Sequence, residues 1–86
     1  MMDNTNDPSS MSMGDMTASL SGLTGDAFDK AFISEMIVHH QGAIGMAKLA
    51  ASQAKHQEVK NLANNIVTAQ TAEIAQMQEW QKQWGY

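Results

Sequence analysis

Two methionines and two histidines lie close together in the first half of the sequence, at Met36, His39, His40 and Met46. In an α-helix, which turns about 100° per residue, these four side chains fall within one arc of about 120°. The thioether of methionine is a soft ligand and imidazole is borderline, so together they suit Cu(I), whereas a histidine-rich set suits Cu(II). We therefore expect a copper site on this helix face, with Cu(I) favoured and Cu(II) also allowed.

The spacing leaves two arrangements of these side chains open. Met36 and His40 are four residues apart, so their side chains meet on consecutive turns. His39 and Met46 are seven residues apart and lie along one edge of the arc. The four residues therefore form either one site or two half-sites. The competing interpretation is that the methionines fill a core and the histidines make core hydrogen bonds.

A second group of candidate ligands lies in the C-terminal half, where Glu73 and Met77 are one helical turn apart. They belong to a mainly apolar stripe at helical spacing, formed by Val59, Leu62, Ile66, Gln70, Glu73, Met77, Trp80 and Trp84. A carboxylate in such a face needs a partner, because its unpaired burial is costly. For Glu73 we expect a metal ion, or the N–H of a metal-binding histidine that the carboxylate orients. Alternatively, Glu73 belongs to a polar rim between two subunits.

His56 and the N-terminal methionines are further candidates. His56 lies at the expected break between two helices, where it is either a metal ligand or an exposed loop histidine. Met11, Met13 and Met16 follow the spacing M-x-M-x-x-M, which resembles that of methionine-rich copper-capturing tails. A tail that simply tolerates methionine explains this spacing equally well.

Two long helices are expected to carry the candidate ligands. No proline interrupts residues 27–54, which predicts one helix there with Asp26 as its N-cap. We expect a break at residues 55–57 and a second helix over residues 58–84. A short helix is predicted over residues 16–23, after a flexible tail over residues 1–15 that is rich in Met, Ser and Asn. The prediction is one all-α domain over residues 16–86, a long antiparallel hairpin with a short N-terminal helix.

The size of the chain favours stabilisation by a metal or by a partner. A chain of 86 residues has a marginal core, and the absence of cysteine excludes disulfides and thiolate metal sites. Two helices of about 27 residues each expose an apolar stripe about 40 Å long. Pairing two hairpins into a four-helix bundle would bury that stripe, so we expect a homodimer. Gly42 and Gly45 weaken the first helix by about 1 kcal/mol each, which indicates either close approach of another backbone or simple tolerance.

Several other classes of partner and activity are not expected. The net charge is −4 and only five residues are Lys or Arg, which argues against nucleic-acid binding. No apolar run approaches the roughly 20 residues that span a bilayer, so we expect no membrane insertion. The polar start MMDNTNDPSS does not resemble a cleavable secretory signal. No nucleophile elbow, catalytic cysteine or H-E-x-x-H helix is present, and we do not expect an enzyme.

Three stretches of sequence are specific enough to indicate a family: FDKAFISEMIVHHQGAIGMAKLA, AKHQEV and NNIVTAQTAEIAQMQEWQKQW. Across residues 20–86 the chain resembles the bacterial domain-of-unknown-function family three hundred and five. The resemblance implies a ferritin-like helical bundle, a periplasmic or secreted location, and copper binding or copper resistance among members. On that pattern the motif positions are Met36, His39, His40, Met46, Gln70, Glu73, Met77 and Trp80.

The chain departs from the family pattern at three positions. Glu35 stands where another methionine is common, Gly45 where an acidic residue is common, and Gln57 where proline often follows the histidine. None of these departures removes a presumed soft ligand.

We therefore expect a copper-binding protein, a buffer, chaperone or resistance factor that catalyses no reaction. A ferritin-like di-metal oxidase is one alternative, but such sites need several inward carboxylates and Glu-x-x-His pairs. Here Glu35 lies four residues before His39, not three. A helical interaction module without metal, in which the histidines only form hydrogen bonds, is the other alternative.

Overall fold

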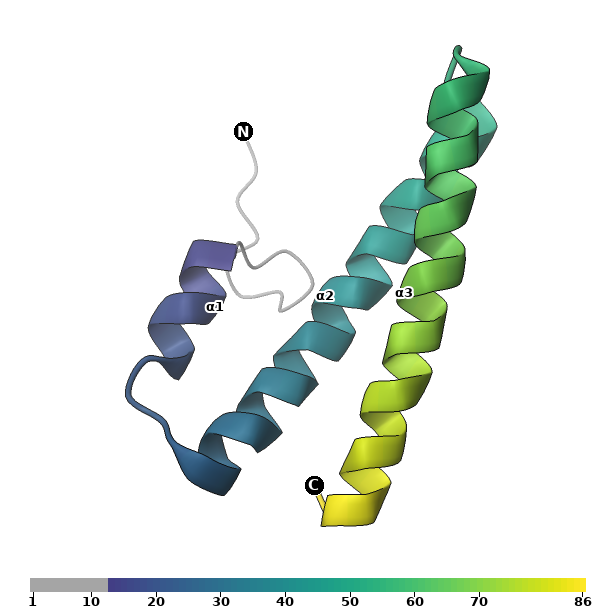
Figure 1. The fold of residues 1–86 in the computed structure, drawn as a ribbon. Coiled ribbons are helices and arrows are strands. Elements are labelled where there is room, and N and C mark those ends of the chain that lie inside the picture. The colour runs from purple at the N-terminus through teal and green to yellow at the C-terminus, as the bar shows by residue number, and fades with distance from the viewer. Residues whose placement is uncertain (1–12) are drawn as a thin grey trace.

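The computed structural model describes residues 13–86, which form three helices (Figure 1). Helix α1 spans Met13–Leu20, α2 spans Gly25–Gln53 and α3 spans Gln57–Trp84. Residues 13–86 contain no strand. The predicted all-α class and the long antiparallel hairpin with a short N-terminal helix are confirmed. No helix in residues 13–86 has both the length and the apolar character that crossing a bilayer requires.

The helix boundaries correct several predictions. Helix α1 begins at residue 13, so residues 13–15, predicted as tail, form its first turn, where the acidic Asp15 suits the positive end of the helix. The N-cap of α2 is Thr24, in extended conformation, so Asp26 as the N-cap was wrong. Asp26 instead lies in the first turn of α2. The predictions for residues 1–12, including Met11, lie outside the described residues.

The break between the long helices falls close to where the sequence placed it. Helix α2 ends at Gln53 and α3 begins at Gln57, so residues 54–56 form the connection. At Gly45 an added Cβ would meet no atom within 4 Å. Close approach of another backbone within residues 13–86 is therefore not the reason for that glycine.

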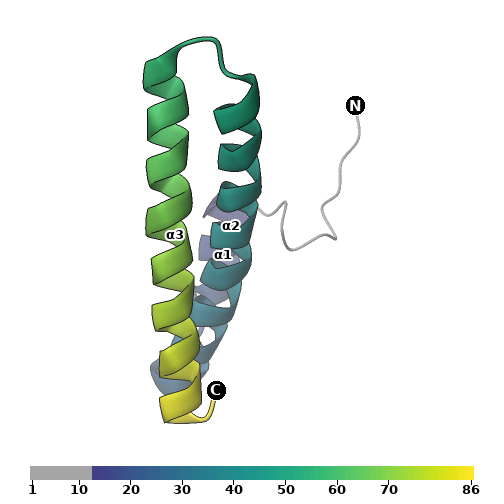
Figure 2. The ribbon, with the colours of Figure 1, turned by 90° about the vertical axis from the view of Figure 1, so that its right-hand side faces the viewer.

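The long helices α2 and α3 run antiparallel beside one another, and α1 packs against α2 on the side away from α3 (Figures 1 and 2). Met16 and Leu20 are the buried residues of α1. The hydroxyl of Ser19 donates a hydrogen bond to Oε1 of Glu35 on α2, at 3.1 Å. Helix α2 is therefore the central element, in contact with both other helices.

The interface between α2 and α3 has a thin core. Its buried residues are Ile33, His40 and Ala47 on α2, and Ala63 and Met77 on α3. Only Ile33 and Met77 among these are large apolar side chains. Within residues 13–86 no large side chain is fully buried. The hairpin alone thus has little of the apolar burial that stabilises a small domain.

A hydrogen bond joins the two ends of the hairpin. Gly85 ends α3 in the left-handed conformation, with φ of 75°, and turns the chain back toward α2. The hydroxyl of Tyr86 then donates to Oδ1 of Asp26 at 3.2 Å, and the Tyr86 ring packs edge-on against Trp84. Desolvation, and then the hydrogen bond to Asp26, raise the pKa of the Tyr86 hydroxyl above its ordinary value.

Candidate metal centre

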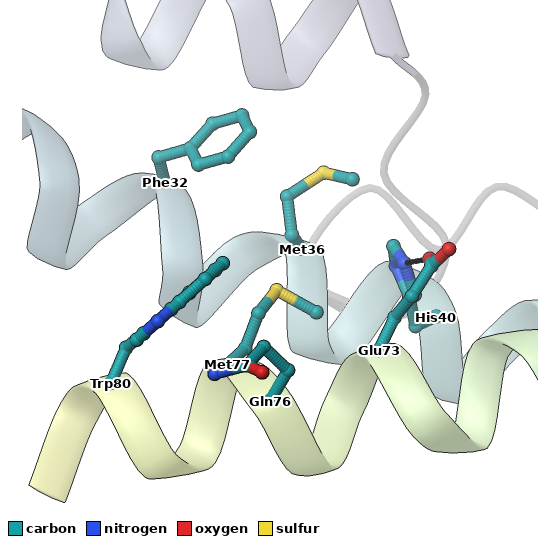
Figure 3. A pocket seen from close by; sticks show the side chains of 7 residues that line it. All are labelled: Phe32, Met36, His40, Glu73, Gln76, Met77 and Trp80. Atoms are coloured by element: carbon teal, nitrogen blue, oxygen red, sulfur yellow. Dashed lines mark hydrogen bonds and ion pairs between the residues drawn. The ribbon is translucent and has the colours of Figure 1, made fainter.

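A pocket of about 260 Å³ lies between the two long helices (Figure 3). Four of the predicted ligand residues line it, Met36 and His40 from α2 and Glu73 and Met77 from α3, together with Phe32, Gln76 and Trp80. The hairpin brings these two pairs of residues together, although they lie more than 30 residues apart in the sequence. The structure therefore brings together one soft ligand and one polar group from each helix.

His40 and Glu73 form the polar contact of this pocket. The distance between Nε2 of His40 and Oε1 of Glu73 is 2.6 Å, which Figure 3 marks as a dashed line. An ionised carboxylate can only accept a hydrogen bond, so Nε2 carries the hydrogen and donates the hydrogen bond to Oε1. His40 is buried, whereas the side chain of Glu73 is 57% exposed. The contact with a histidine N–H from the first long helix is one of the two partners predicted for Glu73.

The other ring nitrogen of His40, Nδ1, is buried and has no hydrogen-bond partner within residues 13–86. In a neutral imidazole only one ring nitrogen carries a proton, so a neutral ring that donates from Nε2 presents a lone pair at Nδ1. A buried polar atom without a partner costs about 1–3 kcal/mol and is rare in folded proteins. A cation bound at Nδ1 would remove this cost, and metal-binding histidines typically donate their second ring N–H to a carboxylate or a carbonyl, as His40 does here.

Two thioethers lie beside this imidazole. Side chains in a helix lean toward its N-terminus, so His40 leans toward the turn that carries Met36. Met77 is 7% exposed and lies one turn after Glu73 on α3. Two thioethers and one imidazole nitrogen form a donor set that suits Cu(I). These residues thus fit a soft monovalent metal ion better than a hard one.

The remaining predicted ligands lie outside this pocket. Met46 is 71% exposed and lines a second, wholly apolar groove of about 280 Å³ with Ala43, Ala47, Ala50, Val59, Leu62, Ala63 and Ile66. His56 is exposed at the N-cap of α3, about 20 Å along the helix axis from His40. His39 is half-buried, with its ring centroid 6.4 Å from that of His40. The structure therefore divides the predicted helix face into two parts.

Gln70 is half-buried and does not line the pocket, whereas Gln76, which sequence reasoning missed, does line it. Gln76 could have been predicted from its spacing, because it lies three residues after Glu73 and so shares one side of α3 with it. Met16 is only 4% exposed, which fits a packing role. No three His, Asp or Glu side chains within residues 13–86 converge as metal ligands, unlike the carboxylate-rich sites of di-metal oxidases.

The comparisons with known proteins identify the family. The family described as domain of unknown function DUF305 matches residues 1–81. The chain belongs to this family. It is also 39% identical over 49 residues to an uncharacterized protein of Acanthamoeba polyphaga mimivirus, a match that covers 57% of this chain and 32% of the viral protein. No solved structure matches. The DUF305 description names no ligand or activity.

Proposed function

We propose that this DUF305 protein binds copper as a buffer, a chaperone or a resistance factor. Met36, Met77 and Nδ1 of His40 would hold the ion, with Cu(I) favoured and Cu(II) allowed. The observation that carries the proposal is the buried Nδ1, which has no partner within residues 13–86, on a ring whose other nitrogen donates a hydrogen bond to Glu73 at 2.6 Å. Glu73 would orient the imidazole and keep its proton on Nε2.

The chemistry of the site also supports a place outside the cytoplasm. The chain contains no cysteine. In oxidising compartments thiols form disulfides, whereas a site built from methionine thioethers is not lost in that way. We therefore propose a periplasmic or secreted protein that binds and transfers copper and catalyses no reaction.

A titration of Cu(I) against a competing chelator tests the site. Met36→Leu and Met77→Leu should each lower the affinity by about tenfold or more, the equivalent of about 1.4 kcal/mol, because each removes a soft donor while leucine keeps a similar volume. Met46→Leu is the matched control and should leave the affinity unchanged, because Met46 lies in the other groove. Equal affinity in all three variants would show that the ion binds elsewhere.

A helical interaction module without metal is the second candidate, and the exposed apolar residues of the hairpin favour it. The two candidates differ in how copper affects stability. A ligand that binds only the folded state raises the unfolding temperature as its concentration rises. If Cu(I) leaves the unfolding temperature unchanged, the interaction module is the better account. We further propose that the protein is a homodimer.

A further inference from the structure

Within residues 13–86 seven large hydrophobic residues are exposed, and five of them line the two grooves between α2 and α3, namely Phe32, Met46, Val59, Leu62 and Trp80. Helix geometry places them on one side of the hairpin. At about 100° per residue, Phe32 and Met46 lie within about 40° of one another on α2, and Leu62 and Trp80 coincide on α3. We call the side that carries these five residues the open face.

Few apolar side chains are buried between α2 and α3, and several large ones are exposed on the open face. The interface between α2 and α3 buries only two large apolar side chains, Ile33 and Met77. Leu62 and Met46, which are 59% and 71% exposed, lie just outside it. A domain of this size usually needs a metal, a disulfide or a partner to be stable. The exposed apolar side chains of the open face are therefore available for a partner to bury.

The dimensions of the open face fit a second copy of the same hairpin. Each long helix is about 40 Å long, and two helices side by side are about 20 Å wide. The face thus offers about 800 Å² per copy, which matches the roughly 1,600 Å² in total that a stable protein interface buries. Among residues 13–86, none with a charged side chain lines the second groove, and Glu73 is the acidic residue that lines the first, where it already accepts a hydrogen bond from His40. Two such faces can pack together, as in a four-helix bundle, without placing unpaired charged side chains against one another.

Two-fold symmetry then fixes what the partner adds to the metal centre. His39 lies at the midpoint of α2, which spans residues 25–53. The two-fold axis of a face-to-face dimer lies in the plane between the two open faces. An axis parallel to the helices, or one perpendicular to them at mid-height, places the midpoint of one hairpin level with the midpoint of the other. We infer that a second copy of this chain covers the open face, and that His39 of the partner subunit approaches the pocket of Met36, His40 and Met77. The second part of this inference rests on the proposed copper site.

Sedimentation of the metal-free protein tests the docking face without reference to copper. Leu62→Ala should raise the dissociation constant of the dimer at least tenfold, because it removes an apolar side chain from both halves of the interface. Leu49→Ala is the matched control, since Leu49 is 54% exposed and lines neither groove. It should leave the constant unchanged. Alanine is the best helix former, so both variants keep their helices.

A monomeric wild type, or equal dissociation constants for the two variants, would overturn the docking face. The melting temperature of the wild type gives an independent reading, because that of a dimer rises with protein concentration. A melting temperature that does not change on hundredfold dilution would also overturn it. A hetero-partner on this face, or coverage by residues 1–12, would give that result.

Copper then tests the contribution of His39. Cu(I) should lower the dissociation constant of the wild-type dimer, whereas in His39→Ala the dissociation constants with and without Cu(I) should be equal. If Cu(I) binds the Leu62→Ala monomer as tightly as it binds the wild-type dimer, His39 of the partner subunit contributes nothing. If no copper binds but the metal-free dimer behaves as expected, the proposed function fails and the docking face stands.

Discussion

The replacement Glu73→Gln tests how the carboxylate acts on the metal centre. Glutamine has the same length, and its side-chain oxygen can still accept the hydrogen bond from Nε2 of His40. It lacks the negative charge that strengthens the 2.6 Å contact. The variant thus removes the influence of the charge on the imidazole and leaves both proposed thioether ligands in place.

The size of the effect follows from the exposure of the carboxylate. Carboxylates that orient a metal-binding histidine contribute about 10–100-fold to metal affinity. The side chain of Glu73 is 57% exposed, and solvent screens its charge, which favours the lower end of that range. We expect the Cu(I) affinity to fall about tenfold, or about 1.4 kcal/mol. The metal-free protein should lose no more than about 1 kcal/mol of stability, the net contribution of one hydrogen bond.

The assay is the chelator-competition titration with Cu(I), and Glu79→Gln is its control. Glu79 is an exposed carboxylate on α3 that accepts a hydrogen bond from Gln83 and lines neither groove. The Glu79→Gln variant should bind Cu(I) with the affinity of the wild type. An affinity of Glu73→Gln equal to that of Glu79→Gln would refute the assignment of Glu73 as the residue that orients His40.

Three further predictions concern stability and pH. His40→Leu should abolish tight Cu(I) binding yet leave the urea midpoint of the metal-free protein equal or higher, because it removes the buried Nδ1 that has no partner; a large loss of stability would contradict this. Ala63→Leu, at a position 2% exposed, should destabilise the hairpin by about 1–3 kcal/mol through overpacking, whereas Ala72→Leu at an exposed position should change stability by less than about 0.5 kcal/mol. Absorbance titration of Tyr86, the single tyrosine, should give a midpoint above 10.0, which Asp26→Asn lowers. Because the pKa is raised in the folded state, its stabilising contribution is present below the unfolded value and lost as the pH rises through the folded value; an unshifted midpoint would contradict the contact.

The hairpin could be predicted from the sequence because its signals are local. Uninterrupted helical periodicity predicts both long helices, and the family resemblance agrees with them. The boundary errors arose where several polar residues compete to begin a helix. Thr24 and Asp26 are both suitable N-cap types, and the sequence does not say which of them adopts the extended conformation observed at Thr24.

The candidate site was only partly predictable, because angular position on a helix says nothing about height along it. Met46 shares the arc of Met36 and His40, yet six residues separate it from His40, a rise of about 9 Å. That rise places Met46 in a different groove. The contact of His40 with Glu73 was predictable as one of two options, since a carboxylate on an apolar stripe needs a partner. The unpartnered Nδ1 depends on the ring orientation, which no sequence pattern specifies.

X-ray absorption spectroscopy at the copper edge, on the Cu(I)-loaded protein, tests the central claim most directly, because it reports which atoms surround the ion. A site formed by Met36, Met77 and His40 predicts sulfur and nitrogen neighbours in the wild type. The double variant Met36→Leu/Met77→Leu should lose the sulfur signal, and Met46→Leu should retain it. Copper surrounded by nitrogen and oxygen alone, or sulfur that persists in the double variant, would contradict the proposed site.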